Sequence, residues 1–284
     1  LPIQEDGTAL IIWAFWNHFS RYRNIEFARK LYEPLVVKSA NFMINYRDYN
    51  TGLPLPSYDL WEERYGVHTF TTSTVCSALK SASNFAEVFG DHDKVNEFRS
   101  AAYKMKEAID KYLFSEKYGR YIRTLFLDKI GDQQDPTLDS SLYSTFAFEI
   151  FDVKDKKIIS TMEAVHKGLT IKTDIGGIAR YENDHLNKVS SDIENVPGNP
   201  WIICTLWVAQ YLIAKAETYA DLQEALQIMK WVLRHSFESG VIPEQIHPYT
   251  GQSVAVSPLT WSHSEFILTV HRFLEKLAYI RKFS

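Results

Sequence analysis

The sequence lacks the features that mark several large protein classes. It holds two cysteines in 284 residues and no cluster of lysine and arginine. No apolar run approaches the ~20 residues of a membrane-spanning helix. The formal net charge is −4. Without a basic patch a nucleic-acid partner is not expected, and without a long apolar run neither is a membrane.

The cysteines and the first residues bear on the cellular compartment. Cys76 and Cys204 each lie in an apolar stretch with helical periodicity. This is typical of buried free thiols and favours a reducing, cytoplasmic setting. No signal peptide is visible, and the first residue is Leu1 rather than methionine. We expect the sequence to begin within a longer protein.

Common catalytic and cofactor motifs are absent as well. The sequence contains no G-x-S-x-G nucleophile elbow, no P-loop and no G-x-G-x-x-G dinucleotide motif. Neither H-E-x-x-H nor C-x-x-C is present, and the nine histidines are scattered. We therefore predict neither a metal site nor a cofactor.

What the sequence does have is strong helical periodicity. Apolar spacing and capping residues predict nine long helices, at residues 6–22, 27–47, 68–89, 92–114, 138–151, 154–170, 199–217, 219–239 and 257–278. A single strand is predicted at Tyr118–Phe126. No linker interrupts these elements, so one domain over residues 1–284 is expected.

The predicted helices alternate in character. Every second helix carries one charged face, whereas the first, third, fifth, seventh and ninth are poor in charge and rich in small residues. This alternation predicts an all-α fold of helical hairpins around an axis, an α/α toroid, with the charge-poor helices inside. A plain helical bundle is the alternative.

An unusual loop precedes each of the predicted inner helices. The loops hold acids, tryptophans and an arginine, at residues 4–6, 59–64, 132–139, 179–199 and 240–256. Inner helices of a toroid all point the same way, so these loops would meet at one end. That arrangement predicts an active-site cleft on a rigid scaffold.

Carboxylates beside tryptophans fit the hydrolysis of a glycosidic bond, which needs one protonated and one ionised carboxyl group. Glu62 lies between Trp61 and Glu63, with Asp59 close by. An apolar neighbour and a nearby negative charge both raise the pKa of a carboxyl group, so Glu62 is the candidate acid. Glu244, before the last inner helix, is the candidate partner; an ordinary surface glutamate is the alternative.

Several motifs resemble those of the inverting glucoamylases, glycoside hydrolase family 15. The matching segments follow the family's order along essentially the whole chain, and they are "YDLWEE" (Tyr58–Glu63), "ARYEND" (Ala179–Asp184), "GNPWIICTLW" (Gly198–Trp207), "PEQ" (Pro243–Gln245) and "PLTWSHSEF" (Pro258–Phe266). The run "QEDG" (Gln4–Gly7) matches a weaker motif.

The resemblance implies a role for each matching residue. Glu62 resembles the general acid, and Glu244 resembles the general base that activates water. Arg180 resembles the residue that binds hydroxyls of the non-reducing terminal glucose, and Trp261 resembles an aromatic residue near the base. The implied substrate-binding residues are Asp59, Trp61, Glu63, Arg180, Asp184, Trp201 and Trp261.

The sequence also departs from the family. Members close a toroid of twelve helices, whereas nine are predicted here, and the missing ones would lie before Leu1. Neither an early W-x-R-D-type segment nor the N-terminal β-sandwich of bacterial and archaeal members has a counterpart. We expect either a part of a longer protein or a natural truncation. A toroid without one inner helix would expose core surface and lose part of its glucose site.

The implied function is release of β-D-glucose from the non-reducing ends of α-glucans, with inversion. Trehalase and glucodextranase of the same fold are alternatives, and "PLTWSH" favours glucoamylase. A non-catalytic carbohydrate-binding or regulatory protein on this scaffold is a further alternative. Presence of both Glu62 and Glu244 favours the enzyme, because a decayed site would usually lose one of them.

Overall fold

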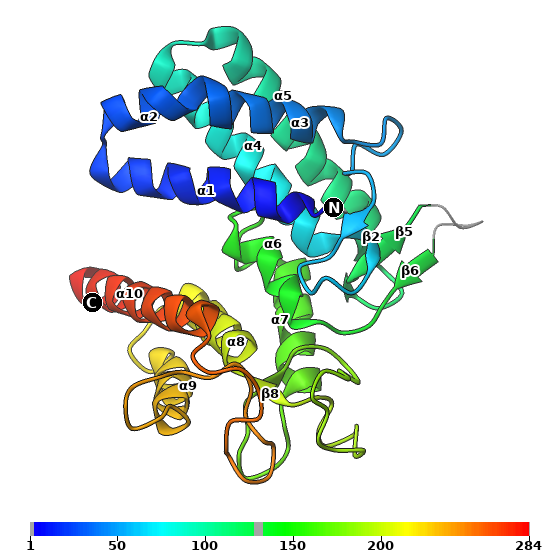
Figure 1. Cartoon of the computed structure of the whole chain (residues 1–284), viewed down its shortest axis with the longest axis vertical. Helices are drawn as coiled ribbons and strands as arrows, with labels where there is room; N and C mark the ends of the chain where they lie inside the picture. Colours follow the sequence, from blue (N-terminus) through cyan, green and yellow to red (C-terminus); the bar gives the residue numbers. More distant parts are fainter. Residues whose placement is uncertain (1–2, 128–132, 284) are drawn as a thin grey trace. The chain divides into compact units, whose positions relative to one another are not determined.

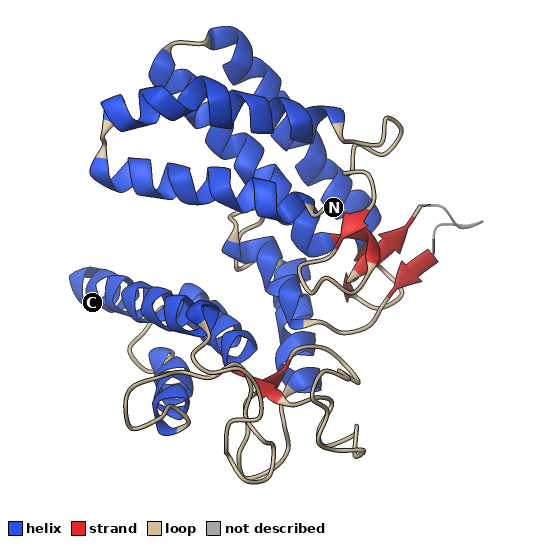
Figure 2. Cartoon of the chain, viewed as in Figure 1, coloured by secondary structure: helices blue, strands red, loops and turns tan. Residues whose placement is uncertain are grey.

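The computed structural model describes residues 3–127 and 133–283. Helices dominate it, and the strands are short (Figure 2). The chain divides into two compact units by its internal contacts. Unit 1 comprises Leu1–Pro136 and Phe148–Ile150, and unit 2 comprises Thr137–Ala147 and Phe151–Ser284. One catalytic domain over residues 1–284 stays a prediction, and Asp132 of the third loop lies outside the described residues.

Unit 1 is built around one buried helix, α4 (Thr69–Phe89), which packs against α1 (Glu5–Tyr22) and α5 (His92–Ala108) (Figure 1). Nearly every side chain of α4 up to Ala86 is buried, so this helix is covered on all sides over most of its length. Asp91 begins α5 by accepting a hydrogen bond from the backbone N–H of Lys94. The last turn continues as a π-helix, Ile109–Leu113.

The predicted helix at 27–47 is continuous but not regular. It consists of α2 (Ile25–Leu31), a π-helical turn (Tyr32–Val37) and α3 (Lys38–Asn45). Pro34 lies inside that turn. Proline has no N–H to donate and its ring collides with the preceding turn, so the wider π-helix is a physical response to its presence.

A small antiparallel sheet in unit 1 has the strand order β1 (Ser57–Tyr58), β2 (Tyr65–His68), β5 (Thr124–Phe126), β6 (Gln133–Asp135). A separate pair joins β3 (Phe114–Ser115) to β4 (Arg120–Tyr121). The predicted strand Tyr118–Phe126 is therefore two strands. It breaks because the chain changes partners after Tyr121, from β3 to β2 and β6.

Unit 2 is organised around α8 (Ile202–Lys215), whose residues 202–213 are all buried. Helices α7 (Lys156–Leu169), α9 (Leu222–Arg234) and α10 (Thr260–Phe283) pack against it. The short helix α6 (Ser144–Ala147) follows a 3-10 turn, Ser140–Tyr143. Strands β7 (Ile178–Ala179) and β8 (Pro200–Trp201) pair directly before α8.

Eight of the nine predicted helices are found in the described residues, with ends shifted by up to five residues. The helix predicted at 138–151 is wrong in length, because only a 3-10 turn and the four-residue α6 form there. The all-α class is confirmed. The prediction that inner helices are buried on more than one side is confirmed for α4, for residues 140–146 and for α8. The same prediction is wrong for α1 and α10, which bury a single face. Ile11, Ile267 and Leu274 are each more than half exposed on these two helices, at 55%, 58% and 54%.

Among the described residues, no helix combines the length and the apolarity that crossing a membrane requires.

Candidate active site

The "DLWEER" segment is the connection of a β-hairpin in unit 1. Residues 59–64 link β1 to β2, which pair through Tyr58 and Tyr65. Asp59 holds the connection closed, because its Oδ1 accepts hydrogen bonds from the backbone N–H groups of Glu63 (2.8 Å) and Arg64 (3.0 Å). Asp59 is 2% exposed, so its first role is to shape the loop.

The three residues at the tip of this loop have different surroundings. Trp61 is buried at 8% exposure, whereas Glu62 is exposed. Glu63 is partly buried and bonds to Arg64 through Oε2, at 2.9 Å. Glu62 adopts a left-handed backbone with φ of 59°. Such strain in a residue other than glycine persists where the surroundings enforce it and clusters at functional sites, so it marks Glu62.

Two further carboxyl groups lie behind this loop and were underestimated from the sequence. The "QED" segment begins α1, and Gln4 donates a hydrogen bond from Nε2 to the carbonyl of Asp59 at 3.2 Å. Glu5 and Asp6 are 0% and 2% exposed, and within the described part of the chain neither carboxyl oxygen of Glu5 has a hydrogen-bond partner. Acidic residues directly before an apolar helix were the available signal.

Burial changes the protonation of this pair. It raises the pKa of Glu5 to about 9, with the charge of Asp6 adding to the effect and Arg47 opposing it. Burial likewise raises the pKa of Asp6 to about 7, with a backbone hydrogen bond from Gly7 opposing the effect and the charges of Asp59 and Glu62 adding to it. Near neutral pH, Glu5 therefore holds a proton.

These shifts predict a stability that depends on pH. The folded chain retains protons that the unfolded chain releases, so the free energy of unfolding falls as pH rises from about 4.5 towards 9. In Glu5→Gln the side chain is neutral at every pH. Its stability relative to the parent should therefore be greater at pH 8 than at pH 5, by on the order of 2–4 kcal/mol.

The measurement is chemical denaturation of both proteins at the two pH values. Glu26→Gln is the control, because Glu26 lies on the same unit with its side chain 76% exposed. It should shift stability little at either pH. Equal effects of Glu5→Gln at both pH values would show that Glu5 ionises normally.

The centre of the candidate site in unit 2 is a buried ion pair. Arg180 and Asp184 are 2% and 1% exposed, and Arg180 donates from Nε (2.9 Å) and Nη2 (2.6 Å) to the two carboxylate oxygens. The guanidinium lies over the rings of Tyr181 (4.6 Å) and Trp201 (4.9 Å). Trp201 donates from Nε1 to Asp184 at 3.2 Å. The structure thus joins three predicted residues in one cluster.

Short strands fix this cluster. Pairing of β7 with β8 sets Ile178 opposite Trp201 and Ala179 opposite Pro200, and Arg180 directly follows β7. Gly198 precedes β8 because no larger residue fits. A Cβ atom there would approach Cβ of Asp184 to 2.9 Å and Cβ of Ala179 to 3.3 Å.

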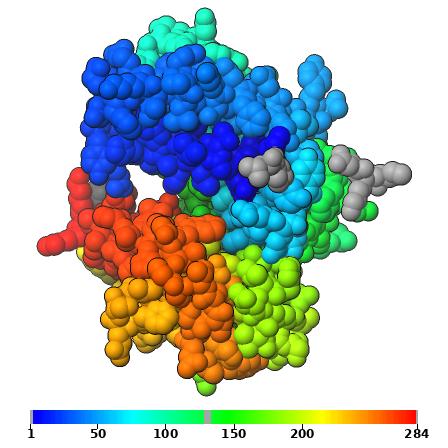
Figure 3. All heavy atoms as spheres, viewed as in Figure 1, coloured from blue at the N-terminus to red at the C-terminus, as the bar shows by residue number. Residues whose placement is uncertain are grey.

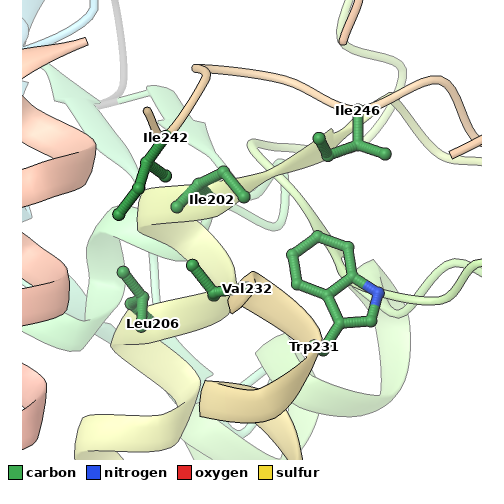
Figure 4. Close-up of a cluster of buried hydrophobic side chains, with 6 residues drawn as sticks. All are labelled: Ile202, Leu206, Trp231, Val232, Ile242 and Ile246. Atoms are coloured by element: carbon green, nitrogen blue, oxygen red, sulfur yellow. The ribbon is translucent and has the colours of Figure 1, made fainter. Parts of the chain in front are cut away.

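Glu244 lies on a loop that hydrophobic side chains anchor in unit 2. Ile242 and Ile246, on either side of it, belong to a buried cluster with Ile202, Leu206, Trp231 and Val232 (Figure 4). The backbone of Glu244 accepts from Ile202 N–H and donates to Val256 carbonyl, both at 3.1 Å. The Glu244 side chain itself is partly exposed.

A chain of amides reaches the carboxylate of Glu244. Asn199 donates from Nδ2 to Oε1 of Gln245 at 2.9 Å, and Gln245 donates from Nε2 to Oε2 of Glu244 at 3.1 Å. Asn199 and Gln245 are buried at 1% and 0% exposure. Sequence reasoning missed both, although each lies inside a quoted motif, "GNPW" and "PEQ".

Trp261 begins a stack of rings in unit 2. Its ring lies 5.8 Å from that of Trp207, which stacks on Tyr143 at 4.1 Å and an interplanar angle of 8°. The indole Nε1 of Trp261 donates to Glu265 at 3.4 Å. Gln210 donates from Nε2 to the other oxygen of Glu265 at 2.7 Å. Glu265 is therefore fixed, and its hydrogen bond orients the indole of Trp261.

The predicted site residues thus form two groups. Asp59, Trp61, Glu62 and Glu63 belong to unit 1, and the other five belong to unit 2. Within each unit the predicted loops meet. In unit 1, β6 of the third loop joins the sheet that carries residues 59–64. In unit 2, Asp139 bridges to Tyr181 and Trp201 bridges to Gln245.

The known proteins that this chain resembles over nearly its whole length include two from archaea. An uncharacterised glycosyl hydrolase of Methanocaldococcus jannaschii is 30% identical over 283 residues, covering 95% of this chain and 42% of that protein. Trehalase 2 of Sulfolobus acidocaldarius is 22% identical and covers 97% and 43%, respectively. The chain thus spans less than half the length of these relatives.

The fold and the family of the chain follow from one solved structure and one family model. A bacterial glucoamylase complexed with acarbose has a TM-score of 0.78 at 23% identity, covering 97% of this chain and 41% of that one. This likeness shows that the fold is the α/α toroid of glucoamylase. The family model described as Glycosyl hydrolases family 15 matches residues 2–230, and the chain belongs to that family.

Proposed function

We propose that the chain carries the acid and the base of an inverting, exo-acting glycosidase that releases β-D-glucose from the non-reducing ends of α-glucans. The observation that carries this proposal is that both motif carboxylates are present and fixed. Glu62 is exposed on a strained hairpin, and Glu244 is partly exposed on an anchored loop. Membership of a glycosyl hydrolase family supports it.

In the proposed reaction Glu62 donates its proton to the glycosidic oxygen, and the bond from that oxygen to the anomeric carbon breaks. Glu244 removes a proton from a water molecule that attacks the anomeric carbon from the opposite face. Room for this water requires carboxyl groups about 6.5–9.5 Å apart. That separation between Glu62 and Glu244 is an expectation of the proposal.

Neighbouring side chains are proposed to prepare the two carboxylates. Gln245 engages Oε2 of Glu244, which leaves Oε1 to accept the water proton. Asp59 fixes the hairpin so that Glu62 stays at its tip. The proposed substrate-binding residues remain Asp59, Trp61, Glu63, Arg180, Asp184, Trp201 and Trp261.

The stereochemical outcome is the direct test. An active protein that contains these residues should give β-glucose as the first product from maltose, observed by proton NMR before mutarotation mixes the anomers. Inversion follows from a single displacement by water. α-Glucose as the first product would overturn the assignment of Glu244 as a base.

Trehalose hydrolysis is the second candidate activity, because one relative is named a trehalase. The two activities differ in substrate and share the proposed acid and base. Initial rates on maltose, longer malto-oligosaccharides and trehalose at equal concentration separate them. Preference for trehalose would replace the glucan in the proposal, and no turnover of any of the three would favour a non-catalytic protein.

A further inference from the structure

Unit 2 also contains a surface pocket. It has a volume of about 610 Å³ and is lined by residues 234–237, at the end of α9, and by parts of the loop 251–257. None of the predicted site residues lines it. Ligand pockets typically measure about 300–1,000 Å³. The segment after α9, orange in Figure 3, forms part of the surface of unit 2.

One wall of this pocket presents an aromatic ring to solvent. Phe237 is 47% exposed, although a phenyl ring gains by burial. The turn that carries it is closed, because Phe237 N–H donates to Val241 carbonyl (2.9 Å) and Gly240 N–H donates to Phe237 carbonyl (2.8 Å). The backbone that carries Phe237 is therefore fixed, and the ring stays largely uncovered.

The imidazole of His235 is also held in a defined orientation. Its Nδ1 lies 2.9 Å from the carbonyl of Trp231, and its ring lies 4.5 Å from the Trp231 ring. A carbonyl accepts, so Nδ1 carries the hydrogen and Nε2 of the neutral ring is an acceptor. Gly251 has a φ of 73°, and a Cβ atom at this position would lie 3.3 Å from Nε2 of His235. Because glycine has no Cβ, the approach to this nitrogen stays open.

The chemistry of the lining favours a sugar. Among the described residues that line it, Arg234 supplies a positive charge and none is a carboxylate, while histidine, serine and glutamine side chains supply the other polar atoms. A pyranose has an apolar face for Phe237 and hydroxyl groups that both donate and accept hydrogen bonds. An inorganic anion would use Arg234 but would gain nothing from the exposed ring.

The far wall of the pocket belongs to the loop of Glu244. Glu244 N–H donates to Val256 carbonyl at 3.1 Å, Val254 N–H donates to Gln245 carbonyl at 3.3 Å, and Ile246 bridges to Ser253. Residues 244–246 and 253–256 are therefore two sides of one ladder. A ligand held against the second side stays within a few residues of the proposed base.

We propose that this pocket is a second α-glucan-binding site, which tethers a substrate chain next to the Glu244 loop. The choice of an α-glucan as its ligand rests on the proposed function. A tether of this kind raises the local concentration of chain ends without taking part in the reaction. It should matter for long glucans and not for maltose.

β-Cyclodextrin is the probe, because a closed ring of α-linked glucose units has no non-reducing end for an exo-acting site. Calorimetric titration should show saturable binding to the parent and to Glu62→Gln alike. Phe237→Ala should weaken binding several-fold and by at most about tenfold, since loss of an aromatic contact is worth up to about a factor of ten. Phe27→Ala, which removes a phenylalanine with 45% exposure from unit 1, is the matched control.

A second variant tests the other wall of the pocket, and thermal unfolding of each variant guards against a folding defect. Gly251→Ala places a methyl group towards Nε2 of His235 and should also weaken binding, with Phe27→Ala unchanged. The proposal would be overturned if the parent did not bind cyclodextrin, or if Phe237→Ala bound it as tightly as the parent. It would also be overturned if the pocket bound inorganic phosphate but not cyclodextrin. Absence of hydrolysis with intact cyclodextrin binding would instead overturn the proposed catalysis and leave the pocket standing.

Discussion

Glu62→Gln is expected to abolish turnover of maltose in an active protein that contains these residues, while hydrolysis of glucosyl fluoride largely survives. The amide cannot protonate the glycosidic oxygen, but fluoride departs without a proton. General acid catalysis typically contributes about 10²–10⁴-fold, so the loss on maltose should be of that size. Steady-state kinetics on both substrates measure it.

Glu244→Gln should impair both substrates, because each still needs an activated water molecule. Glu63→Gln is the control, since Glu63 is the adjacent carboxylate and is bonded to Arg64. It should raise KM and leave some turnover. If Glu62→Gln turns over maltose normally while Glu63→Gln does not, the acid has been assigned to the wrong glutamate.

Asp184→Asn is expected to destabilise the fold by about 3–5 kcal/mol, because it leaves the charge of a buried arginine without its carboxylate. Arg180 is 2% exposed, so water cannot replace the lost partner. The variant also weakens the bond from Trp201, which Asp184 accepts at 3.2 Å. Denaturant unfolding measures the change in free energy.

Glu217→Gln is the matched control for this second prediction. It removes the carboxylate of an ion pair with Lys154 on the same unit, whose side chains are 64% and 67% exposed. Such exposed pairs contribute about 0–1 kcal/mol. Equal destabilisation by the two variants would mean that the Arg180–Asp184 pair is hydrated in solution.

The helices could be predicted from the sequence because long apolar periodicity and capping residues are local signals. The strands could not, apart from the region of Tyr118–Phe126. Strands of two to four residues, such as Pro200–Trp201, carry too little pattern of their own and form only because a partner lies beside them. The prediction that α1 and α10 are buried on more than one side was wrong for a similar reason, because burial depends on which neighbours surround a helix.

The site was predictable where residue type and motif coincide. Arg180, Asp184 and Trp201 were named from the sequence, and the structure joins them in one cluster. Gln245 and Asn199 were missed because an amide has no signature of its own and acquires its role from the hydrogen bond it makes in three dimensions. Glu5 and Asp6 were underestimated because their near-complete burial, rather than their type, sets their pKa values.

The left-handed backbone of Glu62 has a consequence for how this lineage can change. At φ of 59°, glycine or asparagine would relieve the local strain that glutamate bears. A copy of the gene released from catalysis would therefore gain stability by the same replacement that removes the proposed acid. Retention of glutamate at this position opposes that gain, so the residue found here in each descendant would record whether selection for hydrolysis has continued.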